Sequence, residues 1–275
     1  TTSELVKISS DGNLGLEEGQ KFERGGIYRF TVDVTKGNTK AVLTVEKVGK
    51  VDLPAPDIFF GNDKMEVTDT DIYKSDQAFT QGQMITVTGI DNLNEWWIDP
   101  DFFEKQSDGA LKFLPINGDY RVTANAVLKY FSVMALKDGK PAKLQDDGTG
   151  AIWAIGKGIG KPSVASSEVG WEPGKALCLA QVAPKKYQLT LKAGETLKTS
   201  GDPEVISFKF FHQNDWGGEF GNYASSILVE QLKLADSGNL EMQDNKAFEE
   251  GAVYRFTIDV TNGNANADLK VEKIN

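Results

Sequence analysis

The sequence predicts an all-β protein built from tandem antiparallel β-sandwich modules. The first observation is an internal repeat: residues 6–48 and 232–274 align without a gap, 226 positions apart, and are identical at 21 of 43 positions. The second is a period of two in both copies, in which every other residue is apolar, as in a strand with one dry and one wet face. The third is the scarcity of helical periodicity in a chain of 275 residues with 28 Gly and 9 Pro.

The repeat predicts a β-hairpin at the end of each copy. In the first copy, apolar and polar residues alternate from Tyr28 to Thr35, and a second alternating run covers 41–45. A Thr-Lys-Gly-Asn turn at 35–38 separates the two runs, because Gly and Asn accept the positive φ that tight turns need. Residues 254–271 repeat this order, and upstream turns at 12–14 and 238–240 predict a further short strand in each copy.

A degenerate third copy at 108–111 and 118–123 divides the chain into three segments. Residues 1–49 match only the back half of the last module, residues 52–137 form a divergent β-sandwich module, and residues 149–275 form a full one. A Pro-bearing link at 51–56 and a polar link at 137–148 separate them. Three segments agree with a chain that is longer than one domain of about 150 residues.

Two segments depart from the alternating pattern. The best helical candidate is one or two turns at 224–231. The run Ile-Gly-Lys-Gly-Ile-Gly-Lys at 155–161 fits neither phosphate-binding signature, because its third glycine comes too early and Pro162 follows its last lysine. With no helix after it, we expect this run to be a flexible loop between strands.

The first segment is predicted to be an incomplete sandwich. A half-module of 49 residues leaves one apolar sheet face open to water, at about 25 cal/mol per Å². We therefore expect residues 1–49 to pack on the second segment or on another chain. Because the chain starts midway through a repeat unit, we also expect further sequence upstream of residue 1.

Composition and charge exclude several classes of protein. The net charge of −10 argues against nucleic acid or an anionic membrane as a partner, since phosphate binding needs clustered Lys and Arg. A single cysteine, Cys178, excludes an intrachain disulfide framework and is predicted to be a small buried residue in a strand. No apolar run is long enough to predict a membrane-spanning helix.

The residues that carry most catalytic chemistry are scarce, and we predict no enzyme, no metal site and no cofactor. There is one histidine, His212, and no Gly-x-Ser-x-Gly motif. Asp99 and Asp101 lie beside aromatic residues and are the most suggestive pair of carboxylates for glycoside hydrolysis. An Asp-Pro turn capped by its own side chains is the favoured interpretation of these two residues.

The tryptophans indicate a binding function. Trp153 lies in an apolar run, as a core residue does, but Trp171 and Trp216 lie in loops among small and polar residues. An indole face stacks on the C–H face of a pyranose ring, while Lys209, Asn214 and Asp215 supply polar groups for its hydroxyls. Trp96 and Trp97 are candidates for a second site in the middle segment. The alternative is that these tryptophans plug the ends of the sandwiches.

With these residues, the third segment resembles the β-sandwich modules of SusE/SusF-type surface glycan-binding lipoproteins of Bacteroidetes. The motifs that carry the resemblance are Ile152-Trp153-Ala154-Ile155-Gly156, Gly170-Trp171, residues 186–194, residues 208–211 with Asp215-Trp216, and the Gly-Asn-Leu and Tyr-Arg-Phe-Thr-Ile-Asp runs of the final hairpins. The Gly-rich segment 156–170 departs from the family by being longer. The resemblance implies modules of the immunoglobulin-like or carbohydrate-binding-module-like kind.

The same resemblance implies a non-enzymatic protein of the cell surface. It would be lipid-anchored in the outer membrane through a segment upstream of this chain and would hold polysaccharide or oligosaccharide for an outer-membrane glycan importer. Trp171 and Trp216 would be its stacking residues, and Lys209 a hydroxyl donor. Two alternatives stay open: a structural or adhesive spacer without a sugar site, and a fragment of a glycoside hydrolase that uses Asp99 or Asp101.

Overall fold

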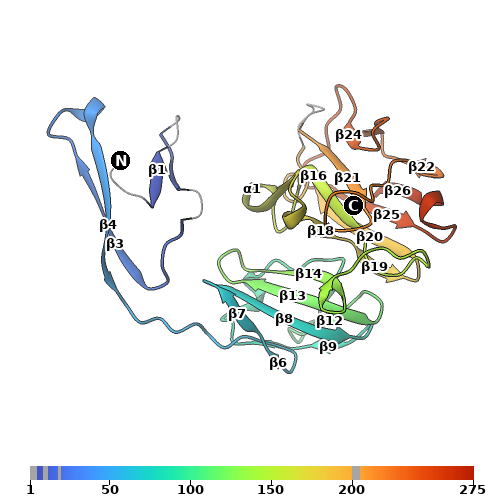
Figure 1. Cartoon of the computed structure of the whole chain (residues 1–275), viewed down its shortest axis with the longest axis horizontal. Helices are drawn as coiled ribbons and strands as arrows, with labels where there is room; N and C mark the ends of the chain where they lie inside the picture. Colours follow the sequence, from blue (N-terminus) through green and yellow to red (C-terminus); the bar gives the residue numbers. More distant parts are fainter. Residues whose placement is uncertain (1–4, 9–11, 18–19, 200–204) are drawn as a thin grey trace. The chain divides into compact units, whose positions relative to one another are not determined.

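The computed structural model describes residues 5–8, 12–17, 20–199 and 205–275, and its architecture confirms the predicted all-β, antiparallel fold (Figure 1). The chain divides into two units, Thr1–Pro56 and Asp57–Asn275. Among the described residues, no helix has the length and hydropathy needed to cross a membrane.

The described part of unit 1 contains two hairpins. They are β1 (Val6–Ile8) with β2 (Leu14–Leu16), and β3 (Gly26–Asp33) with β4 (Val42–Lys50); the 3-10 helix η1 (Asn38–Lys40) lies in the second turn. Phe30 lies opposite Val45, as the alternating pattern predicts. The turn places Gly37 at a φ of 92°, which is a conformation that glycine adopts without strain.

The first module of unit 2 covers residues 57–145. Its strands are β5 (Phe59–Phe60), β6 (Asp63–Lys64), β7 (Glu66–Asp69), β8 (Ile72–Phe79), β9 (Met84–Ile85), β10 (Val87–Thr88), β11 (Phe103–Lys105), β12 (Leu111–Phe113), β13 (Gly118–Asn125), β14 (Tyr130–Lys137) and β15 (Lys140–Pro141), with the 3-10 helix η2 (Leu93–Glu95). A five-stranded sheet in the order β15-β14-β13-β8-β7 packs with two three-stranded sheets, β11-β12-β9 and β10-β5-β6. Phe60, Phe79 and Phe113 are buried between them.

The second module of unit 2 covers residues 151–275. Its strands are β16 (Trp153–Gly160), β17 (Glu168–Gly170), β18 (Leu177–Cys178), β19 (Ala180–Ala183), β20 (Lys186–Lys192), β21 (Ser207–Phe211), β22 (Ser225–Ile227), β23 (Leu232–Leu234), β24 (Leu240–Met242), β25 (Val253–Asp259) and β26 (Asp268–Lys273); its helices are α1 (Val164–Ser167), η3 (Pro173–Lys175) and η4 (Asn264–Asn266). One sheet has the order β17-β16-β21-β24-β23, and the other β19-β20-β25-β26-β22. Phe208 and Phe210 from the first sheet contact Phe256 from the second, which builds a sandwich core.

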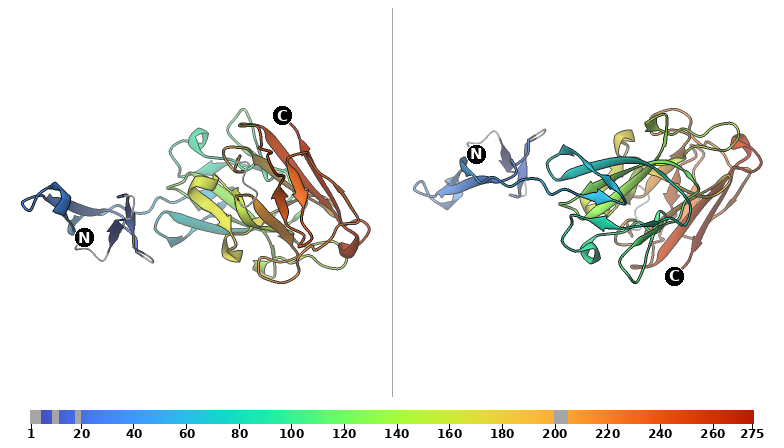
Figure 2. Two further views of the ribbon diagram at one scale, coloured as in Figure 1. Left: turned by 90° about the horizontal axis from the view of Figure 1, so that it is seen from above. Right: turned by 90° about the horizontal axis from the view of Figure 1, so that it is seen from below.

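The two modules of unit 2 pack side by side (Figures 1 and 2). The backbone N–H of Ile116 donates to the carbonyl oxygen of Gln181 at 2.9 Å, and that of Leu144 donates to the carbonyl oxygen of His212 at 2.8 Å. Gln81 adds a side-chain bond to the carbonyl oxygen of Val182 at 3.2 Å. Direct hydrogen bonds to the backbone of the second module therefore tie the two modules together.

All three repeat endings have the same order of two hairpins. The pairs are β1–β2 with β3–β4, β11–β12 with β13–β14, and β23–β24 with β25–β26. In unit 2 an earlier strand completes the second hairpin, because β8 pairs with β13 and β20 pairs with β25. In the described part of the chain, β4 is the only strand that pairs with β3.

The prediction of a helix at 224–231 is wrong. This segment instead contains strand β22 at 225–227, which pairs in parallel with β26, and the side chain of Ser225 donates to Asp268 at 2.7 Å. Pairing with a distant strand thus determines the secondary structure of this short segment, because its own helical propensity is weak. The polar link at 137–148 also contains structure, since β15 turns back on β14.

The Gly-rich run 155–161, expected to be a flexible loop, belongs largely to the buried strand β16. Gly156 has a φ of 141°, and a Cβ on it would lie 2.4 Å from the Cα of Phe208. A Cβ on Gly160 would lie 2.4 Å from the carbonyl oxygen of Ser167. The glycines are there because the backbones of neighbouring strands and turns approach β16 closely.

We expect Gly156→Ala to lower the free energy of unfolding by at least about 2 kcal/mol, since the new Cβ meets backbone atoms and the φ is strained for alanine. Urea unfolding followed by tryptophan fluorescence measures the change. Gly174→Ala is the matched control, because a Cβ at Gly174 meets nothing within 4 Å. Equal stability of the two variants would contradict the packing described for β16.

Candidate functional site

Trp171 and Trp216 come from different loops and meet on one face of the second module. Trp171 directly follows β17, and Trp216 lies in the loop after β21. Their ring centroids are 6.3 Å apart, and the ring planes are inclined by only 25°. Trp216 also makes an edge-to-face contact with Phe211, with centroids 6.0 Å apart. The structure thus brings together the two tryptophans that the sequence singled out.

The loop that carries Trp216 is closed by its own hydrogen bonds. The backbone N–H of His212 donates to the carbonyl oxygen of Gly218 at 2.7 Å, and the side chain of Gln213 donates to the carbonyl oxygen of Trp216 at 2.6 Å. Gly217 and Gly218 both have positive φ, which allows the chain to reverse. In this closed loop Trp216 remains 50% exposed. All five tryptophans of the chain lie in the ranges that the structure describes, so each can be compared with it.

The predicted polar residues lie on the same strand and loop. The Oδ1 of Asp215 accepts a bond from the backbone N–H of Trp216 at 2.8 Å, so this carboxylate also orients the turn. Lys209 is half-buried on β21, and strand alternation puts it on the same face as Phe211. Asn214 is half-buried in the loop, whereas Asp215 is exposed. An ammonium group, an amide and a carboxylate therefore lie close to Trp216 in the sequence.

Trp96 and Trp97 do not form a second platform of this kind. Trp96 is only 8% exposed and stacks on Phe131 with centroids 4.6 Å apart, so no ring face is left for a ligand. Trp97 is half-buried, and its Nε1 donates to Oε1 of Glu195 at 2.8 Å. The Trp97 ring also lies 5.9 Å from Nζ of Lys161. Trp96 is thus a core residue, and Trp97 belongs to the junction between the modules.

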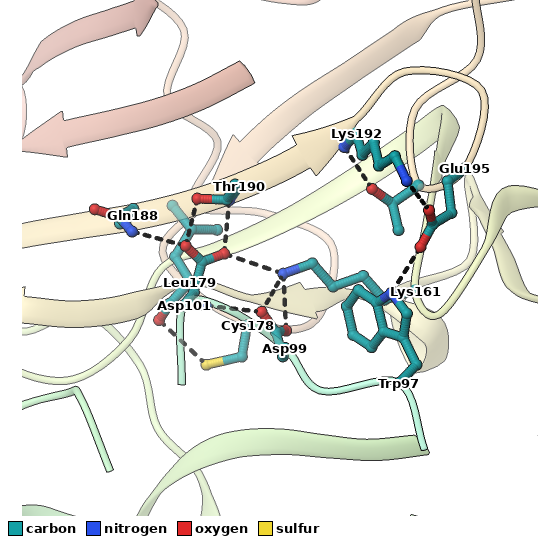
Figure 3. A network of polar contacts seen from close by, with 11 residues as sticks. Trp97, Asp99, Asp101, Lys161, Cys178, Leu179, Gln188, Thr190, Lys192 and Glu195 are labelled. Atoms are coloured by element: carbon teal, nitrogen blue, oxygen red, sulfur yellow. Dashed lines mark hydrogen bonds and ion pairs between the residues drawn. The ribbon is translucent and has the colours of Figure 1, made fainter. Parts of the chain in front are cut away.

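The junction is built around a buried lysine between two aspartates (Figure 3). Nζ of Lys161 lies 2.8 Å from both carboxylate oxygens of Asp99 and 3.1 Å from Oδ2 of Asp101. Lys161 follows β16 in the second module, whereas both aspartates lie in the loop before β11 of the first. All three side chains are buried. A charge network therefore crosses the interface away from water.

Asp101 is held by further donors from β20. Thr190 donates through its backbone N–H and its hydroxyl, both at 2.6 Å, and Gln188 donates at 2.8 Å. Burial pushes the pKa of Asp101 upward, but Lys161, Thr190 and Gln188 together outweigh burial and hold it below its usual range. Asp101 is therefore fixed as an anion with its oxygens occupied.

The other two members of the network respond differently to the same environment. Burial is the largest influence on the pKa of Asp99 and raises it above the usual range, although Lys161 opposes the rise. Burial alone would lower the pKa of Lys161, but the two carboxylates outweigh burial and raise it. The turn is also capped as the sequence predicts, because the backbone N–H of Asp101 donates to Oδ1 of Asp99 at 3.1 Å.

A cavity of about 380 Å³ lies beside this network, which is within the size range of small-molecule sites. Residues from both modules line it, among them Trp97, Asp99, Tyr130, Ser132, Lys161 and Lys175. Lys175 belongs to η3, which closely follows Trp171 in the chain. One loop thus carries a residue of the indole pair and a residue of the cavity wall.

The remaining reactive side chains are confined to packed positions. Burial raises the pKa of the Cys178 thiol to about 12, and the prediction that Cys178 is a buried strand residue is confirmed. The ring of His212 packs edge-on against Phe220 at 4.3 Å, and burial lowers its pKa. Within the described ranges, no three His, Cys, Asp or Glu residues are grouped so as to hold a metal ion.

Comparison with known families adds one assignment. Residues 1–35 and 147–261 match the model described as a domain of unknown function, DUF5121, and together these ranges cover more than half of the chain. The chain belongs to the DUF5121 family. Residues 51–144 match a second domain of unknown function, DUF5125. A search of curated proteins finds no match.

The matches divide the site between two kinds of domain. Trp171, Trp216 and Lys161 lie in the DUF5121 part, whereas Asp99 and Asp101 lie in the DUF5125 part. The buried charge network therefore joins a DUF5125 domain to a DUF5121 domain. The sequence did not predict the role of Lys161 in this network, because its partners are about 60 residues away and no local motif predicts a buried ion pair.

We expect Lys161→Met to lower the free energy of unfolding of unit 2 by about 3–5 kcal/mol, because it leaves two carboxylates buried without their cation. Chemical denaturation measures this loss. Lys157→Met is the matched control, since Lys157 is exposed on the same strand and should change stability by no more than about 0.5 kcal/mol. A Lys161→Met variant as stable as the control would rule out a structural role for the network.

We also expect a specific dependence on pH. Because the pKa of Asp101 is lower in the folded chain than in the unfolded one, its ionised form contributes stability above about pH 4 that is lost as the pH falls through the folded pKa. The raised pKa of Asp99 acts with the opposite sign, since its protonation favours the folded chain. The stability difference between wild type and Asp101→Asn should therefore shrink from pH 5 toward pH 2 in urea titrations; a difference independent of pH would contradict the assignment.

Proposed function

We propose that the protein binds polysaccharide or oligosaccharide without altering it chemically, and that Trp171 and Trp216 form the stacking platform. The observation that carries the proposal is the indole pair itself: two loop tryptophans meet with nearly parallel rings, and Trp216 is half exposed. An exposed tryptophan held by a closed loop loses little conformational freedom when a ligand stacks on it.

The surroundings of the pair suit a sugar better than other ligands. The C–H face of a pyranose packs on an indole, while its hydroxyls need donors and acceptors nearby, which Lys209, Asn214 and Asp215 provide. The net charge of −10 favours a neutral or cationic ligand over an anionic one. A neutral glycan meets both requirements.

The resemblance to SusE/SusF-type modules extends the proposal to the place of action. In this proposal the protein lies at the cell surface, is lipid-anchored in the outer membrane through a segment upstream of residue 1, and passes glycan to an outer-membrane importer. The same resemblance supports a binding protein rather than an enzyme. The oxygens of Asp99 and Asp101 are engaged with Lys161 and with strand β20, which favours a structural role over hydrolysis.

One observation favours a spacer without a sugar site. Trp171 is half-buried, and Trp216 contacts Phe211, so part of each indole covers the sheet. In a spacer protein, the two indoles would only need to shield the sheet from water and would not need to bind a ligand. The two functions differ in whether the exposed part of Trp216 meets a ligand.

We expect Trp216→Ala and Trp171→Ala each to weaken glycan binding at least about tenfold, a loss of about 1.4 kcal/mol. Affinity electrophoresis in gels that contain neutral polysaccharides (starch, mannan, xylan and β-glucan) identifies the ligand, and calorimetry with a matching oligosaccharide measures the loss. Trp216→Phe should keep part of the affinity, because a smaller aromatic face remains.

Val127→Ala is the matched control, since Val127 is an exposed apolar residue of the other module. Its binding should equal that of the wild type. If no neutral polysaccharide retards the protein, or if both alanine variants bind like the control, the platform assignment is wrong and the spacer becomes the better account.

A further inference from the structure

We infer that unit 1 is an open half-sandwich that accepts the front half of a DUF5121-type domain as its partner. Here the front half means a polypeptide equivalent to residues 147–231, which precedes the two hairpins in the complete copy. The inference does not depend on sugar binding, because it concerns hairpins that contain no tryptophan.

The first observation is an apolar face in unit 1 whose counterpart in unit 2 is buried. Phe30 is 47% exposed, whereas the equivalent Phe256 is fully buried. Val32 is 61% exposed, whereas the equivalent Ile258 is fully buried. The same contrast holds for Leu14, Leu16, Phe22 and Val34 against Leu240, Met242, Phe248 and Val260. Apart from the buried Val6 and Val45, unit 1 therefore exposes these residues of the face on which the complete domain builds its core.

The side chains on this face of unit 1 are the same as, or similar to, those at the equivalent positions of the complete copy. Leu14, Phe22, Phe30 and Val34 are the same residue in both copies, and the other positions keep an apolar residue. The ring centroids of Phe22 and Phe30 lie 6.2 Å apart, and several exposed apolar residues together are typical of an interface rather than of a free surface. The face thus keeps the chemistry needed to pack against the front half.

The second observation is a strand edge without a partner. In the complete copy, β20 runs along β25 from Lys186 opposite Asp259 to Lys192 opposite Val253. In the first module of unit 2, β8 runs along β13 in the same way. Among the described residues of unit 1, β3 has β4 on one side and no strand on the other. Such an edge offers a row of N–H and C=O groups for strand addition.

The third observation identifies the occupant. The two ranges that match DUF5121 end at residues 35 and 261, which are equivalent positions of the repeat, 226 residues apart. Unit 1 is therefore the closing part of the same kind of domain. In the complete copy the cover is Leu189 and Leu191 from β20 with Phe208 and Phe210 from the neighbouring sheet, all buried. A partner with these strands fits both the face and the edge.

The test joins a copy of residues 147–230 to Leu5 of the chain, which reproduces the spacing of the complete copy. Hydrogen exchange is measured in this fusion and in the unfused chain, and β25 of unit 2 serves as the internal reference for a paired, buried strand. We expect the amides of residues 27–33 to exchange at least about tenfold more slowly in the fusion, approaching the rates of β25. Unchanged exchange of β3 while β25 stays protected overturns the inference.

Variants on β3 separate the proposed fit from nonspecific effects. Phe30→Asp in the fusion should abolish the new protection, because it puts a charge on the apolar face. Thr31→Asp is the matched control on the opposite face of the same strand and should keep the protection. If both variants keep the protection, or both lose it, the apolar face does not seat the partner and the inference fails.

A second arm uses the unfused chain with a synthetic peptide of residues 184–194, which contains β20. The peptide should slow exchange in β3, and its Leu189→Ser, Leu191→Ser version should not. Sedimentation of the unfused chain tests other occupants. A dimer that Phe30→Asp dissociates assigns the face to a second copy, and β3 amides already protected in a monomer assign it to the chain's own surface; either result overturns the inference.

Discussion

The architecture depends on one constraint: each repeated pair of hairpins has an apolar face and a free strand edge, and both need cover. In unit 2 the cover comes from the preceding residues of the same module, because β8 pairs with β13 and β20 pairs with β25. The two modules differ strongly in sequence, yet both satisfy the constraint with the same order of strands. In the described part of unit 1 no third strand pairs with β3, and residues as apolar as Phe30 and Val32 are exposed there. At about 25 cal/mol per Å², leaving such apolar area in water is unfavourable.

The interface between the modules of unit 2 depends on buried charges rather than on apolar contacts alone. Burying Lys161, Asp99 and Asp101 costs desolvation energy, and the cost is offset only because every charged group finds close partners. Such a network adds little net stability compared with an apolar contact of the same size. It does fix the geometry, since Asp101 must reach Thr190 and Lys161 at once. The cavity lined by Trp97 and Lys175 therefore has walls from two modules held in one defined arrangement.

The periodic pattern of apolar residues predicted the repeated hairpins. Predictions from local sequence failed where contacts with distant residues determine the structure. The alternation from Tyr28 to Val34 and from Tyr254 to Val260 predicted the hairpins, because side-chain period and burial coincide there. Gly156 looked like a loop residue, but it lies in a strand because the backbone at Phe208 leaves no room for a side chain. The residues around Lys161 in the sequence did not predict its burial or its ion pairs, since its partners come from another module. Of the candidate site, loop tryptophans were recognisable from their small and polar neighbours, but burial of Trp96 against Phe131 was not.

The division between repeated and unrepeated parts links the two proposals. The hairpins supply scaffold, whereas both residues of the indole pair come from loops that precede them, after β17 and after β21. A front half that completes unit 1 would therefore bring its own loops of this kind and a second platform. Two platforms in one assembly raise the effective concentration of each for a long glycan, so the apparent affinity for polysaccharide rises above that for a short oligosaccharide. Completion of the half-sandwich would then change the strength of binding to polymers while leaving the Trp171–Trp216 site itself unchanged.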